Sequence, residues 1–407
     1  MCRRAEGDAA AAGVSGKPET GMAGGMSGKP ETSAGPETGF PARTLYGRLK
    51  VLEEPGAPLE PEQRLKAMNR PLLAWYETHA RVLPWREDPQ PYRVWISEIM
   101  LQQTRVEAVK PYFERFLKEL PDVAALARVE DDRLMKLWEG LGYYNRARNL
   151  KKAAAVVAEN YGGRMPSDYG TLLKLPGIGT YTAGAIASIA FGQPVPAVDG
   201  NVLRVISRVL ASREDILKQS TKRWMEALLA KTMPQDQASH FNQGLIEIGA
   251  VVCVPAGSPR CGECPLESLC LAKREGLTGE IPVKTPAKKR RREERTVCIL
   301  EQGSRVGIRK RGSSGLLADL YELPNVEGYL ESEALASSFG LEPGNILQVE
   351  PLPEARHIFS HVEWHMKGYR VLFAGEFPRE YMAVEKGDLQ TVYPLPNAFA
   401  AYRKLIR

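Results

Sequence analysis

The stretch from Leu175 to Asn201, LPGIGTYTAGAIASIAFGQPVPAVDGN, constrains the fold of this chain more than any other segment. It begins with a hairpin that contains Gly177 and Gly179, and glycine permits a positive φ and the close approach of another backbone. The hairpin opens into a helix of small residues, whose first amides can bind a phosphate oxygen. The stretch ends at a tight turn that carries the carboxylate of Asp199. Either feature alone could be an ordinary turn, but together they are typical of an enzyme that acts on nucleic acid.

The composition indicates a globular protein with more than one domain. The 407 residues are 43% apolar and 26% charged, and this length is enough for two domains. No apolar run reaches the roughly 18 residues that a membrane-spanning helix needs. The first residues carry acids and lack a sustained apolar core, which argues against a signal peptide. We therefore expect a cytoplasmic protein without a membrane partner.

The chain divides into four segments by composition and periodicity. Residues 1–60 form a leader rich in Gly, Ala, Ser and Pro, which cannot bury a core and is expected to be disordered. Residues 61–275 form one domain, and residues 296–407 form a second. Residues 276–295 form a basic linker, in which Lys284–Arg295 holds seven Lys and Arg against two Glu. Such a run is more often a solvated linker than a DNA contact, which we keep as a secondary role.

The two domains differ in their predicted secondary structure. The first is predicted to be mostly α, with helices at Val94–Phe116, Leu150–Tyr161, Thr182–Phe191 and Trp224–Leu229. The second is predicted to be α+β, because the apolar period changes after the linker. It has a predicted helix at Ser332–Phe339 and predicted strands at Thr296–Leu300, Arg305–Arg309, His361–Met366 and Tyr369–Ala374.

Glu98 lies in an unusually apolar helix, VWISEIML. Burial disfavours a charged carboxylate and raises its pKa, which suits a general acid that works near neutral pH. The alternative is that Glu98 faces solvent on an amphipathic helix. Gln102, Gln103 and Thr104, which follow it, favour the first interpretation, because together with Glu98 they match a motif of a known enzyme family.

The segments LPWR (Leu83–Arg86) and SEIMLQQT (Ser97–Thr104) resemble those of the A/G-specific adenine DNA glycosylases, the MutY-like family. The hairpin and Asp199 resemble the helix-hairpin-helix, Gly/Pro…Asp motif of the base-excision DNA glycosylase superfamily. The resemblance runs from about Arg64 through Gly249 and resumes across the C-terminal domain. It implies an enzyme that flips out and removes adenine mispaired with 8-oxoguanine or guanine in double-stranded DNA.

The resemblance also implies catalytic roles for four residues. Glu98 matches the general acid, which protonates adenine at N7 and makes the base a leaving group. Asp199 matches the carboxylate that stabilises the resulting sugar cation, and Asn201 matches its neighbour. One protonated and one ionised acid follow the logic of glycoside cleavage. Tyr181 stands where bifunctional relatives carry a Schiff-base lysine, so we expect a monofunctional enzyme that leaves an abasic site.

Further residues match the DNA and base contacts of the family. The pocket for the flipped adenine is matched by Trp85, Arg86, Leu101, Gln237 and Gln243. Gln103 and Tyr143 match residues that insert into the duplex and fill the vacated stack, which offsets the cost of base flipping. For each aromatic residue, plain core packing is the alternative interpretation.

Four of the six cysteines, Cys253, Cys261, Cys264 and Cys270, lie within eighteen residues. Cytosolic chains rarely group cysteines for disulfides, so the grouping favours a metal site. Zinc fits less well, because only Cys261 and Cys264 have the C-x2-C spacing. The resemblance implies a [4Fe-4S] cluster held by the four thiolates, which folds a loop that presents Arg260 to DNA. The family usually leaves six residues between its first two ligands, and here there are seven, which a surface loop can absorb.

The second domain resembles the Nudix-like half of the adenine glycosylases. The matching segments are Gly315–Leu317, Glu322–Pro324 and Phe359–His361. In the family the last of these loops contacts 8-oxoguanine, so Phe359, Ser360 and His361 are expected to recognise the lesion. The acidic helix that binds metal in Nudix hydrolases is missing from Glu331–Gly340, which argues against pyrophosphate hydrolysis.

Three histidines of this domain, His357, His361 and His365, recur every four residues. The surrounding alternation predicts a strand, along which four residues span roughly 13 Å. That spacing is too long for one metal ion, and we expect no metal site here.

Two other classes of protein compete with the adenine glycosylase. A bifunctional pyrimidine-lesion glycosylase/lyase would need a lysine in place of Tyr181 and would normally lack a second domain. A non-catalytic DNA-binding protein would keep the hairpin but would need neither Glu98 nor Asp199. The presence of both acids, the tyrosine and the second domain favours the adenine glycosylase.

Overall fold

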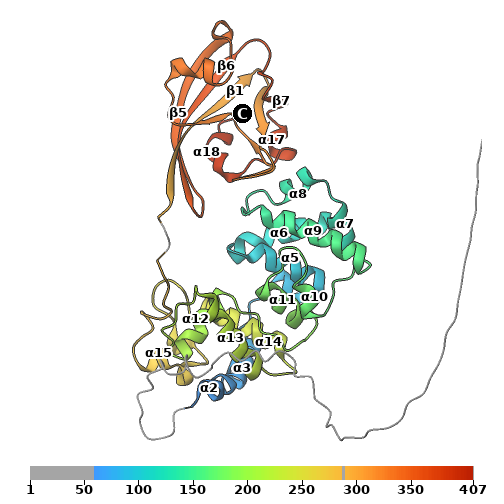
Figure 1. Ribbon diagram of the computed structural model, residues 1–407, viewed down its shortest axis with the longest axis vertical. Coiled ribbons are helices and arrows are strands. Elements are labelled where there is room, and N and C mark those ends of the chain that lie inside the picture. Colours follow the sequence, from blue (N-terminus) through green and yellow to red (C-terminus); the bar gives the residue numbers. More distant parts are fainter. Residues whose placement is uncertain (1–58, 287–288, 407) are drawn as a thin grey trace, which may run out of the picture. The chain divides into compact units, whose positions relative to one another are not determined.

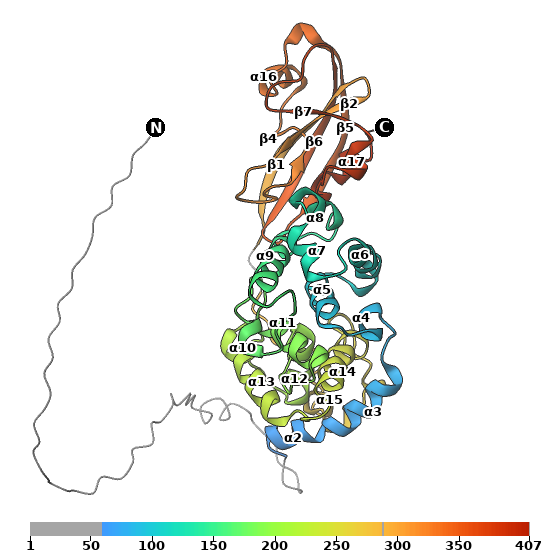
Figure 2. The same cartoon turned by 90° about the vertical axis from the view of Figure 1, so that its right-hand side faces the viewer.

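The computed structural model describes residues 59–286 and 289–406, so the leader expected to be disordered lies almost wholly outside the described residues. Residues 59–286 are helical and the residues from Arg291 onward build a mixed sheet, as Figures 1 and 2 show. The predicted fold class, a mostly α domain followed by an α+β domain, is confirmed. None of the described helices is long and apolar enough to span a bilayer.

The helical domain contains a series of short and medium helices. They are α2 (Pro61–Ala67), α3 (Asn69–His79), α4 (Pro84–Glu87), α5 (Pro91–Leu101), α6 (Val106–Glu119), α7 (Val123–Arg128), α8 (Asp131–Leu137), α9 (Asn145–Asn160), α10 (Tyr169–Leu172), α11 (Thr180–Ala185), a π-helical turn (Ile186–Ala190), α12 (Gly200–Val209), α13 (Gln219–Thr232), α14 (Ala238–Val251) and α15 (Leu271–Arg274).

These helices enclose two apolar cores. The first gathers Trp95 of α5 with residues of α6 to α11, and the second gathers Leu72 of α3 with residues of α12 to α14. The stretch that opens the sequence analysis joins them, because Ile178 belongs to the first core and Val198 to the second.

The hairpin between α10 and α11 depends on Gly177. Its φ is +75°, a conformation that costs an L side chain free energy, and a Cβ there would lie 2.6 Å from Cβ of Asn149. Gly179 is different, since its backbone is extended and a Cβ would meet nothing within 4 Å. Only the first glycine is required by the backbone.

The prediction of one helix over Val94–Phe116 is wrong. The helix is interrupted between α5 and α6, where Gln103 has a φ of 58°. Nη1 of Arg146, on α9, donates to the carbonyl oxygens of Ile99, Met100 and Gln102 at 2.8, 2.9 and 2.7 Å. A buried guanidinium thus satisfies the carbonyl groups at the end of α5, and local periodicity cannot reveal that tertiary contact.

The predicted helix at Thr182–Phe191 exists but differs at both ends. It begins two residues earlier, at Thr180, and its second half from Ile186 to Ala190 is π-helical. Ser188, in that half, accepts a hydrogen bond from Nδ2 of Asn242 at 2.8 Å and itself donates to the carbonyl of Gly184. The predicted helix at Leu150–Tyr161 corresponds to α9, which begins five residues earlier and ends one residue before Tyr161, and the predicted helix at Trp224–Leu229 lies within the longer α13.

The C-terminal sheet has the strand order β3-β2-β1-β6-β5, with β4 paired to β1 and β7 paired to β2. Strands β1 and β6 run parallel, and the other pairs are antiparallel. The strands are β1 (Arg291–Gln302), β2 (Arg305–Lys310), β3 (Tyr321–Glu322), β4 (Asn325–Glu327), β5 (Ile346–Ile358), β6 (Val362–Phe373) and β7 (Met382–Glu385). Because β1 begins at Arg291, the last five residues of the expected linker belong to the sheet.

Each face of the sheet has its own core. One face packs against α17 (Asp388–Thr391) and α18 (Ala400–Arg403), and the other packs against α16 (Leu335–Ser338). The predicted helix at Ser332–Phe339 is only partly correct, because its first turn is a 3-10 helix at Ser332–Ala334.

The two strands predicted at His361–Met366 and Tyr369–Ala374 are one strand, because β6 runs from Val362 to Phe373 without a break and leaves only His361 and Ala374 outside it. Trp364 and Met366 belong to one core, whereas Tyr369 and Val371 belong to the other. The two halves therefore bury opposite faces, and the alternation changes phase at Gly368, which mimics a chain break. A Cβ at Gly368 would lie 2.2 Å from the ring of Tyr402, so the glycine makes room for α18.

The sequence spacing suggested that the three histidines lie along one strand. In the structure they do not. His357 is on β5 and pairs with Trp364, whereas His365 is on β6 and pairs with Arg356. His361 lies in the turn between the two strands. Among the described residues, no three His, Cys, Asp or Glu side chains converge closely enough to hold a single metal ion.

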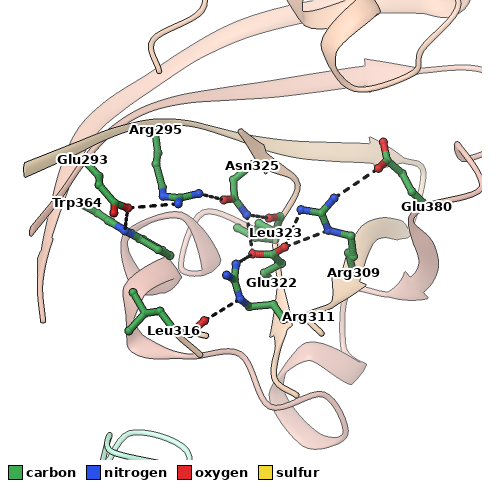
Figure 3. A network of polar contacts seen from close by, with 10 residues as sticks. All are labelled: Glu293, Arg295, Arg309, Arg311, Leu316, Glu322, Leu323, Asn325, Trp364 and Glu380. Carbon is green, nitrogen blue, oxygen red and sulfur yellow. Dashed lines mark hydrogen bonds and ion pairs between the residues drawn. The ribbon is translucent and has the colours of Figure 1, made fainter. Parts of the chain in front are cut away.

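A network of charged groups stabilises the loop that follows β2 (Figure 3). Glu322 is 2% exposed, and its Oε1 accepts from Nε and Nη2 of Arg309 at 3.0 and 2.8 Å. Its Oε2 accepts from Nδ2 of Asn325 at 2.8 Å and pairs with Arg311. Nε of Arg311 also donates to the carbonyl of Leu316 at 3.0 Å, so the network fixes the Gly315–Leu317 segment to the sheet.

Candidate active site

A cavity of about 650 Å³ lies in the helical domain, with residues of both apolar cores in its walls. Residues from α4, α5, α11, α12 and α14 line it. Glu98, Tyr181, Asp199 and Asn201 are all among them. The structure therefore brings together the four residues that the sequence assigned to catalysis.

Glu98 lies on α5 and is 6% exposed. The hydroxyl of Tyr181 donates to its Oε2 at 2.5 Å, although the two residues are 83 positions apart. Burial raises the pKa of Glu98 to about 7, the charge of Asp199 adds to this, and the Tyr181 hydrogen bond and Arg86 oppose it. Half of the carboxyl groups therefore carry a proton near neutral pH, as a general acid requires.

Asp199 forms the N-cap of α12 and has a different environment. Its Oδ1 accepts from the backbone amides of Asn201 and Val202, both at 2.8 Å, and its Oδ2 accepts from Nδ2 of Asn201 at 2.7 Å. Burial raises the pKa of Asp199, and these three hydrogen bonds oppose the rise by stabilising the ionised form.

Asn201 is itself held in place from the side of the cysteine loop. Nη2 of Arg204 donates to its Oδ1 at 2.8 Å and to the carbonyl of Gly249 at 2.7 Å. Nε of the same arginine donates to the carbonyl of Cys253 at 2.7 Å. The buried guanidinium thus fixes the start of α12 against the end of α14.

Four of the five residues expected to contact adenine line the cavity: Trp85, Arg86, Leu101 and Gln243. Trp85 is also buried against Phe113, with ring centroids 5.4 Å apart. It therefore both lines the cavity and packs in the apolar core. Gln237 does not line the cavity: it is exposed at the N-cap of α14, six residues before Gln243. The prediction that Gln237 reaches the base is not supported by its position.

The residues expected to contact the DNA backbone or stack lie at the surface. Gln103 and Tyr143 are exposed, and both have a positive φ, 58° and 48°. Gly179 lines the cavity beside Tyr181, whereas Gly177 shapes the hairpin behind it. Exposed polar and aromatic groups held on tight turns are suited to enter a duplex.

The four clustered cysteines line one cavity of about 20 Å³. Nη1 of Arg208 donates to Sγ of Cys253 at 3.1 Å, and Sγ of Cys270 donates to the carbonyl of Arg208 at 3.4 Å. Burial and, to a smaller extent, the other three thiols of the group raise the pKa of Cys264 to about 12. Arg260 lies beside Cys261 with an exposed guanidinium, as expected.

The residues expected to recognise the lesion, Phe359, Ser360 and His361, lie in the turn between β5 and β6. The amide of Phe359 donates to the carbonyl of Val362 at 2.8 Å, which closes the turn. Ser360 and His361 are exposed. The ring of Phe359 packs edge-on against Trp364 with centroids 4.9 Å apart, so this side chain belongs to the domain core.

Three charged residues of the cavity were missed by the sequence analysis: Arg81, Lys222 and Glu247. Arg81 and Lys222 line the cavity, and Glu247 is fully buried behind it. Glu247 stands in an apolar helix, GLIEIGAVV, as Glu98 stands in VWISEIML. The same signal could have identified it. No pattern in the sequence marks Lys222.

The comparisons with known proteins agree with this geometry. Residues 96–234 match the model of the HhH-GPD superfamily of base excision DNA repair proteins, and residues 296–405 match the NUDIX domain. The chain is 34% identical to the adenine DNA glycosylase of Homo sapiens over 372 residues, which cover 77% of this chain and 68% of that protein. It is 34% identical to the adenine DNA glycosylase of Buchnera aphidicola subsp. Baizongia pistaciae over 297 residues, 72% of this chain and 82% of that protein.

Among solved structures, a thermostable thymine-DNA glycosylase is 29% identical, with 52% of this chain and 97% of that chain covered and a TM-score of 0.47. The match of residues 96–234 to the HhH-GPD model identifies the helical domain as a base-excision DNA repair domain of the helix-hairpin-helix class. The chain belongs to the adenine DNA glycosylases, the enzymes that remove adenine from DNA in base excision repair. The family and the enzyme activity predicted from the sequence are confirmed.

Proposed function

We propose that the enzyme removes adenine that is mispaired with 8-oxoguanine or guanine in double-stranded DNA. The single observation that carries the proposal is the convergence of Glu98, Tyr181 and Asp199 in one cavity, in a chain that also carries the Nudix-like domain. The exposed turn at Ser360 and His361 offers polar side chains for the base opposite adenine.

The chemistry follows from the two carboxyl groups. Protonated Glu98 donates its proton to N7 of the flipped adenine, and the bond between the base nitrogen and the sugar C1′ then breaks with both electrons going to the base. The positive charge left on the sugar is stabilised by the carboxylate of Asp199, which Asn201 holds in position. Water adds to C1′ and its proton is lost to solvent, which leaves an abasic site.

Tyr181 occupies the hairpin position at which bifunctional relatives carry a lysine. This difference supports a monofunctional enzyme. The hydroxyl of Tyr181 is committed to Glu98 and its pKa is raised by burial well above the ordinary value, so it is not a nucleophile at neutral pH. Borohydride added during turnover is expected to trap no covalent DNA adduct at this position. A stable adduct with Tyr181 would contradict the proposal.

The four cysteines fit a [4Fe-4S] cluster. They surround one cavity, and Arg208 donates to one of the sulfurs. A cluster binds each thiolate to a different iron and therefore does not need the sulfurs to converge on one ion, as zinc does. Cys253, Cys261, Cys264 and Cys270 would hold it, and it would fold the loop that carries Arg260. Visible absorption and iron content of the purified protein distinguish this cluster from zinc.

The decisive experiment measures adenine release from duplexes with 8-oxoguanine or guanine opposite adenine. We expect E98Q to lose excision by about a thousandfold or more, since general acid catalysis contributes roughly 10²–10⁴-fold. A second variant, S360A/H361A, tests the preference for 8-oxoguanine and leaves Phe359 in the core. Full activity of E98Q would remove the proposed acid, and an unchanged preference in S360A/H361A would remove the proposed lesion contact.

The remaining expectations also belong to this proposal. A cytoplasmic, nucleoid-associated monomer is consistent with an enzyme that searches DNA, and the chain has a formal net charge of +6. Sedimentation of the purified protein tests the monomer, and imaging of a tagged chain in cells tests its location.

A further inference from the structure

Glu247 is a buried acid next to the active site that the chemistry above does not use. It lies on α14, one helical turn after Gln243, and is 0% exposed. Its Oε1 accepts from Nε of Arg81 at 2.6 Å and from the backbone amide of Arg81 at 3.2 Å. Its Oε2 accepts from Nη2 of Arg81 at 3.0 Å and from Nη2 of Arg86 at 2.7 Å. Both oxygens are therefore fully engaged.

The two arginines are held in a fixed arrangement at the cavity. Arg81 and Arg86 both line it, and Nη1 of Arg86 donates to the carbonyl of Arg81 at 3.2 Å. The guanidinium of Arg86 also lies 5.6 Å from the centre of the Tyr76 ring. These contacts leave Arg86 little rotational freedom, which lowers the entropic cost of contacting the base.

The charges around this trio connect it to Glu98. The groups that face Glu98 are Tyr181 from α11, Asp199 from the N-cap of α12 and Arg86 from α4. Those that face Glu247 are Arg81, Arg86 and the Tyr76 hydroxyl. Arg86 is common to both sets. Whatever neutralises Arg86 therefore also changes the field at Glu98.

We propose that Glu247 is a positioning residue for adenine excision: it holds the guanidinium groups of Arg81 and Arg86 on the cavity wall and neutralises one of their two charges. Two adjacent guanidinium groups without this carboxylate would repel each other in a buried site. They would also place an uncompensated positive charge beside the proton that Glu98 must keep. The effect on Glu98 rests on its proposed role as the general acid.

The electrostatic effect has a definite sign. Arg86 opposes the rise in the pKa of Glu98, which burial brings to about 7. Removing the charge of Glu247 strengthens that opposition, so Glu98 loses its proton at a lower pH. Removing the charge of Arg81 leaves Glu247 paired with Arg86 alone, so Glu98 keeps its proton to a higher pH.

The test compares three full-length variants, E247Q, E247D and R81Q, in single-turnover excision of adenine between pH 5.5 and 9. Rates are normalised to the active fraction, measured from the burst amplitude. We expect the decline at high pH to begin about half a pH unit lower in E247Q, which is about a threefold loss at a fixed alkaline pH. The decline should begin at higher pH in R81Q and stay at the wild-type position in E247D, which keeps the charge.

A purely structural role of Glu247 predicts a different pattern, with a smaller active fraction and no movement of the decline in either E247Q or R81Q. That pattern would overturn the proposal. If E247Q does not fold, the upward movement in R81Q and its absence in E247D decide alone.

A wild-type rate without a decline at high pH would contradict the general acid role of Glu98, not the positioning of the arginines. In that case the positioning of the arginines is tested by measuring the affinity for a duplex that contains a non-cleavable adenosine analogue. E247Q must then bind it about tenfold more weakly than E247D, and equal binding would overturn the proposal.

Discussion

Glu98 and Asp199 are two carboxyl groups in one cavity whose surroundings separate their roles. Glu98 lies in an apolar helix and receives one hydrogen bond, from Tyr181. Asp199 receives three, two from backbone amides and one from Asn201. Hydrogen bonds to the ionised form stabilise it, so Asp199 is the better carboxylate and Glu98 the better acid.

Removing the Tyr181 hydroxyl is expected to raise the pKa of Glu98 further. The hydrogen bond from Tyr181 stabilises the charged form of Glu98 and lowers its pKa against the effect of burial. In Y181F the decline of the excision rate at high pH should therefore begin at a higher pH than in the wild type. A single-turnover pH series measures this. A decline at lower pH would show that the hydroxyl favours the protonated acid instead.

The same burial is expected to destabilise the protein as the pH rises. The pKa of Glu98 lies near 7 in the folded chain against an ordinary 4.5, so the folded state holds the proton more tightly. This stabilising contribution is complete below about pH 4.5 and is lost as the pH rises through 7. At pH 8, E98Q should exceed the wild type in free energy of unfolding by up to about 3 kcal/mol.

Urea denaturation at pH 5 and pH 8 checks this prediction. The advantage of E98Q should be small at pH 5 and large at pH 8. An advantage that is equal at both pH values would mean that Glu98 does not titrate abnormally.

At the scale of elements, helix α12 combines a structural task and a proposed catalytic task in one residue, Asp199. Asp199 caps the helix, and an asparagine substituted at this position could accept the same two backbone hydrogen bonds. D199N should therefore unfold within about 1 kcal/mol of the wild type but lose excision, because it lacks the charge. D199A should lose excision and also about 1 kcal/mol of stability. Thermal unfolding and adenine release separate the two tasks.

The hairpin allows a matched pair of substitutions. G177A places a Cβ at a φ of +75° and 2.6 Å from Asn149, so it should cost at least about 1 kcal/mol of stability and weaken DNA binding. G179A has an extended backbone and no neighbour within 4 Å of the new Cβ. It should leave stability within about 0.5 kcal/mol. Equal losses of stability in both variants would contradict the role of Gly177.

At the scale of the whole molecule, the cysteine group fixes distant parts of the helical domain. Arg208 of α12 contacts Sγ of Cys253 and donates to the carbonyls of Ile281 and Thr278 at 2.8 and 2.9 Å. The end of the helical domain, the cysteine loop and α12 therefore share one buried guanidinium. Loss of the proposed cluster should loosen all three.

C264S is expected to lose visible absorption and to lower the melting temperature by several degrees, about 2–4 °C per kcal/mol lost in a chain of this size. C298A is the control, since Cys298 is buried in the C-terminal sheet and belongs to a different core. It should keep the absorption while losing some packing energy. Loss of absorption in C298A, or its retention in C264S, would contradict the assignment.

Much of this site could be predicted from the sequence, and the exceptions have a physical cause. Glu98, Asp199 and Tyr181 stand out because each is an unusual residue for its local pattern. Glu247 carries the same local signal, an acid in an apolar helix, and was overlooked, whereas Arg81 carries none, because its importance lies in a contact with a residue 166 positions away. The break after α5 was missed for the same reason, since Arg146 ends that helix from a distant segment.

The sequence by itself determined the two-domain order, the helical hairpin, the family and the two acids that we propose for catalysis, because periodicity and motif spacing are local properties. Only the tertiary structure decided how these residues act together. It placed Tyr181 against Glu98, gave Glu98 a pKa near neutrality, left Gln237 outside the cavity and set Glu247 behind two arginines. Burial and charge are sums over neighbours in space, and neighbours in space are what a linear sequence does not state.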